Sequence, residues 1–175
     1  MDWYGLFGLN TLYIGVGEMV FRLVMAMIAG GLIGLDREFK KKPVGLRAFI
    51  IITMSTAGFA LASLELAEGY RAAGDATVDP SRHIQGILGA FGFLGAGAII
   101  QSRGQLAGIA TGASIFAAGA IGTAIGFGII WLGFAIALLS VGTLKAVEML
   151  QHEHDDLVER DTAEELLDPE KRHDT

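Results

Sequence analysis

The 175-residue chain has no cysteine and only three prolines, and charged residues make up 18% of it. Without cysteine it can form neither disulfides nor thiolate metal sites, and it offers no thiol nucleophile. Soluble proteins contain about 25% charged residues, whereas here the residues AVILMFWYC alone reach 52%, and there are 25 glycines besides. A domain of this size has too little interior to bury so much apolar surface. The composition therefore predicts a membrane protein.

Acidic and basic residues are unevenly distributed along the chain. Residues 1–150 contain 10 Lys/Arg and 9 Asp/Glu, and residues 151–175 contain 3 and 10. The net charge of −6 thus comes from a short C-terminal segment. No basic patch typical of a nucleic-acid-binding protein is present, so we expect no nucleic-acid partner. Because no Lys or Arg precedes Arg22, we also expect no cleaved signal peptide.

Apolar runs that approach the length of a bilayer span, about 20 residues, recur along the chain. We expect five transmembrane helices, near residues 16–35, 46–66, 84–101, 106–126 and 128–146. The last two come from a stretch of 39 residues, 106–144, that lacks charged side chains and that Gly126-Phe127-Gly128 divides. The expected fold is an all-α, polytopic membrane domain over residues 1–145, followed by an acidic tail over residues 147–175.

Basic residues predict the orientation, because cytoplasmic loops are enriched in Lys and Arg. The first loop carries five Lys and Arg residues. On the opposite side, the few basic residues are accompanied by acidic residues that offset their charge. Five spans then place the N-terminus outside and the acidic tail in the cytoplasm. We also expect the first helix to extend about two turns beyond the bilayer before Pro43 stops it, and Asp79 to cap the third helix.

Glycine recurs at helical spacing in nearly every expected span. Helices in lipid pack through small residues that let their backbones approach. We therefore expect helix contacts, within one chain or between two, at Gly30, Gly34, Gly92, Gly95, Gly97, Gly108, Gly112, Gly122 and Gly126. Two alternatives stay open. Gly95–Gly97 could interrupt a helix and expose backbone carbonyls to an ion. The Gly30–Gly34 face could form the contact between copies of the chain in a homo-oligomer, with a dimer favoured.

Ionisable residues at the membrane boundary are the candidates for function, since none lies near the middle of a span. Asp36 directly follows the apolar run Val24–Leu35. A carboxylate there needs a partner, which Arg47 could supply across the first loop. The alternative is that Asp36 and Glu38 offer oxygen ligands to a hydrated Mg²⁺ ion. No other cofactor is expected.

Three pairs of opposite charge also lie four residues apart, the spacing that joins side chains on one helix face. They are Glu18 with Arg22, Asp36 with Lys40, and Glu38 with Lys42. An enzyme is not expected, because the four histidines lie outside the spans and no nucleophile stands beside a base.

Three blocks of the sequence resemble the MgtC/SapB family of bacterial membrane proteins. They occur in order between residues 18 and 145: Gly31–Glu38 with Pro43–Arg47; Asp79–Pro80 with Arg82, Gln85–Ile87 and Gly92–Gly97; and Thr111, Ala113–Ile115, Ile121–Gly122 and Gly126–Gly128. The resemblance implies about five helices in the bacterial cytoplasmic (inner) membrane, in a short form without a large C-terminal cytoplasmic domain. Ion-binding or functional candidates are Asp36, Arg37, Glu38, Arg47, Gln85 and Thr111.

The same resemblance implies a link to growth under magnesium limitation and, in pathogens, to virulence through survival inside macrophages. Two modes of action follow from it. One is modulation of another membrane complex, and the other is transport of magnesium or another small solute by an oligomer. We favour modulation, because a dedicated cation path usually contains buried acids and the spans have none.

The start of the fourth helix departs from the family pattern. Where the family usually has Arg-Gly-Leu-Thr-Thr, this chain has Ala107-Gly108-Ile109-Ala110-Thr111, so the arginine is missing at Ala107. Arg103, one helical turn upstream, is the candidate to replace it.

Overall fold

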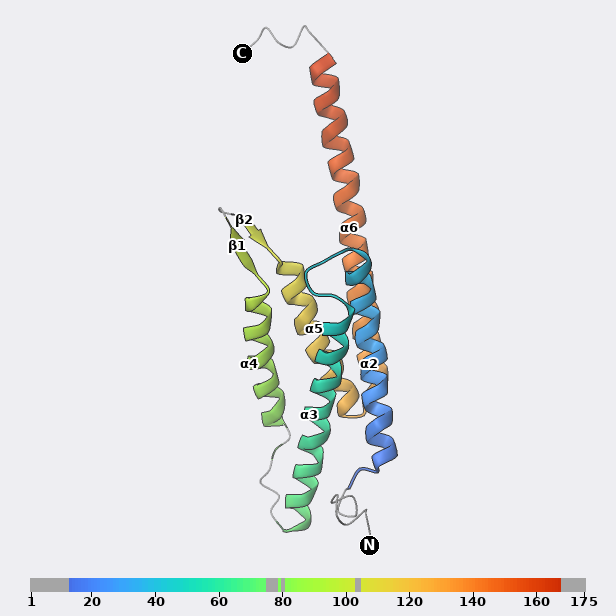
Figure 1. Ribbon diagram of the computed structural model, residues 1–175, viewed down its shortest axis with the longest axis vertical. Coiled ribbons are helices and arrows are strands. Elements are labelled where there is room, and N and C mark those ends of the chain that lie inside the picture. The colour runs from blue at the N-terminus through green and yellow to red at the C-terminus, as the bar shows by residue number, and fades with distance from the viewer. Residues whose placement is uncertain (1–12, 75–78, 80, 103–104, 168–175) are drawn as a thin grey trace. The chain divides into compact units, whose positions relative to one another are not determined.

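The computed structural model describes residues 13–74, 79, 81–102 and 105–167. Five helices follow one another in this part of the chain (Figure 1): α2 (Val16–Phe39), α3 (Leu46–Ala72), α4 (Ser81–Gly97), α5 (Ile109–Gly126) and α6 (Ile130–Leu167). Among the described residues, four helical segments are long and apolar enough to cross a membrane, and α4 is a shorter apolar helix. The prediction of an all-α, polytopic membrane protein is confirmed, and the orientation stays a prediction.

Two helix boundaries lie where the local sequence predicts them. α5 ends at Gly126, and Gly128 has a φ of +88°, a left-handed conformation that glycine adopts without strain. The Asp79 carboxylate accepts hydrogen bonds from the Ser81 N–H at 2.8 Å and from the Ser81 hydroxyl at 2.7 Å, at the start of α4. These bonds lower the pKa of Asp79, so this cap is lost only as the pH falls through that lowered pKa.

Three helix ends differ from the sequence predictions. α2 ends at Phe39, about one turn past Leu35 instead of two. α3 continues to Ala72, beyond the expected end at 66, and Gly74 follows with a φ of +88°. α6 continues to Leu167 instead of ending near 146, because residues 147–167 contain neither glycine nor proline and are rich in helix-forming residues.

A short antiparallel hairpin replaces the end of the expected third helix. Strands β1 (Ile100–Ser102) and β2 (Gln105–Ala107) pair with Ile100 opposite Ala107. α4 ends at Gly97, and Gly108, with a φ of +88°, precedes α5. Glycine is a poor helix former. Gly97 therefore favours the end of α4, and Gly108 favours a start of α5 at Ile109 instead of at residue 106. Gly95–Gly97 therefore ends a helix and does not interrupt one.

The chain divides into two units, Met1–Val141 and Gly142–Thr175, and the described part of the second is the remainder of α6. In the first unit, α2, α3 and α5 pack against one another and α4 packs on α5 (Figure 1). The core contains many small side chains around a few large ones, of which Ile33, Phe49, Ile121 and Ile125 are fully buried. Small side chains let the three helices approach closely.

Six of the nine glycines predicted at helix contacts lie where another helix comes close. A Cβ added to Gly34 would lie 2.8 Å from the Leu46 Cα, and one added to Gly112 would lie 2.7 Å from the Gly95 carbonyl oxygen. Both distances are too short for a real Cβ, so only glycine fits. The same close approach to another helix occurs at Gly30, Gly122 and Gly126, and at Gly95 the Gly112 carbonyl oxygen would lie 3.3 Å from an added Cβ, a tight but less restrictive contact.

The other three glycines have different surroundings. Gly108 is the N-cap of α5 and lies against the backbone of Ala98. Gly92 and Gly97 face open space, with nothing within 4 Å of an added Cβ in the described structure, so the expected contact is not formed there within the chain.

The Gly30–Gly34 face contacts α3 of the same chain. This face therefore packs within one chain, and the homo-oligomer, with a dimer favoured, stays a prediction.

Replacing Gly122 by alanine tests the close contact between α5 and α3. The new Cβ would lie 2.8 Å from the Thr56 Cβ, so we expect Gly122→Ala to reduce the free energy of unfolding in detergent by about 1–3 kcal/mol. Gly89→Ala is the matched control, because nothing lies within 4 Å of its Cβ and alanine favours the helix by about 0.5–1 kcal/mol. Equal stability of the two variants would contradict the contact.

Candidate functional site

Two adjacent charged side chains are buried in the last turn of α2. Asp36 is 8% exposed and Arg37 is 3% exposed. They follow the apolar part of α2, which packs on α3 and α5, so the helix brings both into the end of the bundle. Burying an ionised group is costly unless it is paired and hydrogen-bonded. The partners of these two residues therefore decide what the site can do.

Arg37 connects α2 to the first turn of α5. Its Nη2 donates a hydrogen bond to the Thr111 Oγ1 at 2.9 Å, and both side chains are buried. Thr111 is placed there because α5 begins directly after Gly108. The Arg37 Nε is also buried, yet it has no hydrogen-bond partner in the described structure. Arg37 thus retains an unused donor.

Asp36 pairs along its own helix. Its Oδ1 lies 3.0 Å from the Lys40 Nζ, which confirms the pairing predicted from the four-residue spacing. The Asp36 Oδ2 is buried and has no hydrogen-bond partner among the described residues. The expected partner Arg47 is exposed at the start of α3, so that prediction is wrong. Lys40 takes its place because residues four apart lie on one helix face.

Glu38 lies on a different side of α2 from Asp36. It is exposed, and its Oε2 accepts a hydrogen bond from the Leu46 N–H at 3.0 Å. The N-cap of α3, Gly45, has no side chain to do this, and a carboxylate at a helix N-terminus is favourable. Glu38 therefore caps α3, and this contact takes the place of the expected pairing with Lys42.

The structure does not bring Asp36 and Glu38 together. Within the described part of the chain, no three acidic or histidine side chains lie close enough to share a metal ion. Magnesium binding by these two residues stays a prediction.

We call Asp36, Arg37, Lys40 and Thr111 the charged cluster. Gln85, another candidate, is exposed on α4, and no contact with the cluster is seen in the described structure. Arg103 lies outside the described residues, so its replacement of the missing family arginine also stays a prediction. The cluster consists of two pairs on neighbouring residues of α2, Arg37 with Thr111 and Asp36 with Lys40, and so contains three of the six candidates.

Residues 23–153 match the sequence profile of the MgtC family. This chain belongs to the MgtC family. It is 33% identical to the protein SrpB of Synechococcus elongatus, over 82% of this chain and 84% of that protein. It is 32% identical to the Escherichia coli protein named "Putative magnesium transporter YhiD", over 76% of this chain, and 29% identical to the protein MgtC of Salmonella typhimurium, over 62% of this chain.

The chain spans 62% of the length of YhiD and 43% of that of MgtC. No solved structure matches it. Together with the four long apolar helical segments, the family assigns this chain as a multi-pass protein of the bacterial inner membrane.

Two capping residues at the other end of this MgtC-family bundle were not predicted. Arg22 pairs with Glu18, as its spacing predicts, and its Nη1 also donates a hydrogen bond to the Gly126 carbonyl at 2.9 Å. This places a positive charge at the C-terminus of α5, where the helix dipole favours it. Glu65 accepts hydrogen bonds from two backbone N–H groups just before α2, those of Tyr13 and Ile14. Sequence spacing gave no signal for either long-range contact.

Replacing Thr111 by valine tests its bond with Arg37. The variant keeps the shape of the side chain but leaves a buried guanidinium N–H without an acceptor, so we expect the free energy of unfolding to fall by about 1–3 kcal/mol. Thr123→Val is the control, since the Thr123 hydroxyl donates to the Gly119 carbonyl of its own helix and not to a charged group. Adding Arg37→Met to Thr111→Val should recover part of the loss. Strictly additive losses would argue against the pairing.

Proposed function

We propose that this chain helps the bacterium adapt to magnesium limitation by modulating another membrane complex, and that the charged cluster is the site through which it acts. The observation that carries the proposal is that Asp36 and Arg37 are buried while the Asp36 Oδ2 and the Arg37 Nε have no hydrogen-bond partner among the described residues. An unsatisfied buried polar group costs about 1–3 kcal/mol. Packing alone therefore does not account for the two residues, and a partner that completed these bonds would be bound favourably.

The position of Arg37 supports a functional role as well. Its guanidinium group binds Thr111, the third residue of α5. The N-terminus of a helix carries a partial positive charge, so a cation there is unfavourable. A residue chosen for stability alone would be neutral or acidic at this position. An anionic group that reached this buried position would, by contrast, be stabilised by both the guanidinium and the helix terminus.

Close packing beneath the cluster favours modulation over conduction. A Cβ on Gly30 would lie 2.8 Å from the Phe49 carbonyl oxygen, and one on Gly126 would lie 2.6 Å from the Ala57 carbonyl oxygen. Between these contacts the Thr53 hydroxyl donates a hydrogen bond to the Ala26 carbonyl at 2.8 Å. Such distances leave no room for a hydrated ion between α2, α3 and α5.

The second candidate function is an oligomeric transporter or channel for magnesium or another small solute. The unpartnered Asp36 Oδ2 favours it, because oxygen ligands suit a hydrated Mg²⁺ ion. The name of YhiD, "Putative magnesium transporter", points the same way. Since the three-helix core is closely packed, such a path would have to run outside it, between copies of the chain.

Growth under magnesium limitation tests the site. In a strain that depends on this chain, we expect Asp36→Asn to abolish growth at low magnesium while the protein level in the membrane stays normal. Glu68→Gln is the matched control, because the Glu68 carboxylate is 40% exposed and pairs with Arg71 near the end of α3, away from both arginines of α2. Full growth with Asp36→Asn would remove the cluster from the mechanism.

Magnesium flux into proteoliposomes then separates the two functions. Modulation predicts no flux above that of empty liposomes from folded protein. Flux that Asp36→Asn abolishes would make the chain a transporter and would refute modulation as its primary activity.

A further inference from the structure

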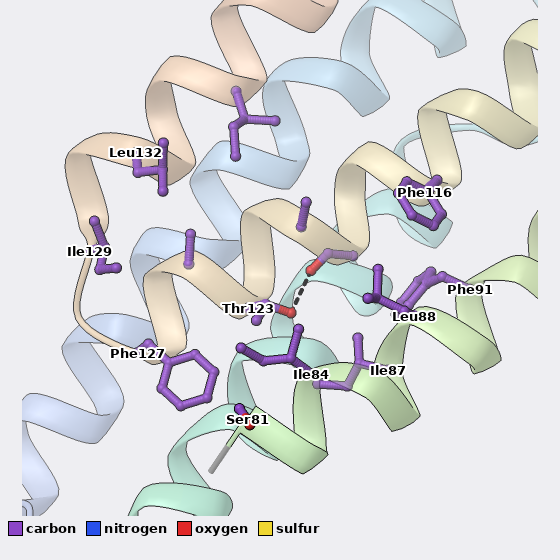
Figure 2. A pocket seen from close by; sticks show the side chains of 14 residues that line it. Ser81, Ile84, Ile87, Leu88, Phe91, Phe116, Thr123, Phe127, Ile129 and Leu132 are labelled. Atoms are coloured by element: carbon purple, nitrogen blue, oxygen red, sulfur yellow. Dashed lines mark hydrogen bonds between the residues drawn. The ribbon is translucent and has the colours of Figure 1, made fainter. Parts of the chain in front are cut away.

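An apolar groove with a volume of about 550 Å³ lies between α4, α5 and the first turns of α6, all within the first unit of the chain (Figure 2). α5 forms its floor with small side chains, while α4 and α6 supply large ones at its sides, such as Leu88 and Leu132. The Thr123 hydroxyl already donates to the Gly119 carbonyl at 2.8 Å. The groove thus offers almost no free polar group to recognise a polar ligand.

The two ends of the groove differ. Figure 2 shows Ser81, Phe127 and Ile129 at one end and Phe91 and Phe116 at the other. Ser81 is the first residue of α4, and residues 127–129 form the turn between α5 and α6. The first end therefore lies near a membrane boundary, where the chain leaves its apolar helices.

The length of the groove matches one leaflet of a bilayer. From Ser81 to Phe91, α4 advances about 15 Å at 1.5 Å per residue. The hydrocarbon core of a bilayer is about 30 Å thick, so Phe91 lies near its middle. Gly119 lets Phe91 close this inner end, since an added Cβ would lie 2.7 Å from the Phe91 ring. The groove thus begins at the boundary and stops about halfway across.

We propose that this groove binds one acyl chain of a bilayer phospholipid, with the headgroup at the Ser81 end. The lining is apolar, the length is that of one leaflet, and the groove continues the lipid-facing surface of the membrane helices, on which Leu88 is 47% exposed and Leu138 62% exposed. The inference goes beyond the proposed function, because it does not involve the charged cluster. The bound lipid would fill the space between α4 and α6 and hold α4 against the core.

Native mass spectrometry of the full chain, reconstituted with phosphatidylethanolamine and phosphatidylglycerol and then transferred to detergent, tests the proposal. We expect one phospholipid to remain bound to the wild type and to be lost from Ala120→Phe, which fills the groove floor from an exposed position of α5. Ala113→Phe is the matched control, because Ala113 is exposed on the same helix but does not line the groove. Equal lipid retention by the three proteins, or no retention by any, would overturn the proposal.

Photolabelling of the wild-type chain in the same vesicles provides a second test that needs no variant to fold. A phosphatidylethanolamine with a diazirine on its acyl chain should label Leu88 and Leu132 more strongly than Phe93, which is 80% exposed on α4 outside the groove. Equal labelling of the three positions would overturn the proposal.

A third test asks whether a second copy of the chain fills the groove instead. Because the chain has no cysteine, Ala120→Cys introduces a single thiol into the groove. Absence of disulfide-linked dimers in membranes is expected. Their formation would identify another copy of the chain as the occupant.

Discussion

Glycine backbones of α2 and α5 lie directly against α3, and this close approach is the constraint on which the rest of the structure depends. Gly30 of α2 faces the Phe49 carbonyl, and Gly122 and Gly126 of α5 face Thr56 and Ala57. Inside a membrane the hydrophobic effect does not drive one helix against another. Dispersion contacts between closely spaced backbones therefore hold the three helices, and any side chain larger than hydrogen at these crossings would separate them.

The charged cluster is a consequence of that packing. With α2 and α5 held at close distance, the guanidinium group of Arg37 reaches the Thr111 hydroxyl without leaving the bundle. A wider bundle would admit water or lipid headgroups, and the unpartnered atoms of Asp36 and Arg37 would no longer be buried. The same small residues close the core to an ion and exclude water from the end of the bundle. Asp36 and Arg37 are therefore buried there, and buried charges in a membrane protein are candidates for function.

Much of the fold could be predicted from the sequence. A membrane span requires a long apolar run, and a close contact between helices in lipid requires a small residue such as glycine. The turn at Gly126–Gly128 followed directly from such a run. The regular spacing of glycines along a helix does not show, however, which surface each glycine contacts. Gly34 and Gly92 both belong to runs of regularly spaced glycines, yet one contacts the Leu46 backbone and the other faces open space.

The partners of the charged residues were predictable only where they lie on one helix. Asp36 with Lys40 and Glu18 with Arg22 follow from the four-residue spacing. Glu38 with Leu46 depends on the path of a loop, and Arg22 with Gly126 joins residues 104 positions apart. Such contacts arise from the three-dimensional packing of the helices, which no local pattern encodes.

The two arginines of α2 bind the two ends of α5 in a matching register. Arg22 and Arg37 are 15 residues apart on α2, and their acceptors, Gly126 and Thr111, are 15 residues apart on α5. Two α-helices share the same rise per residue, so both bonds form at once only in one antiparallel alignment of α2 and α5. A shift of one helix along the other would lengthen both bonds. An interaction that changed the bonding of Arg37 would therefore remove one of the two polar bonds between α2 and α5, and only the Arg22 bond would then join these two helices at a defined register, while the glycine contacts with α3 remained. In this way a local event at the charged cluster could alter the alignment of helices across the whole bundle, which is the kind of change that a neighbouring membrane complex can sense.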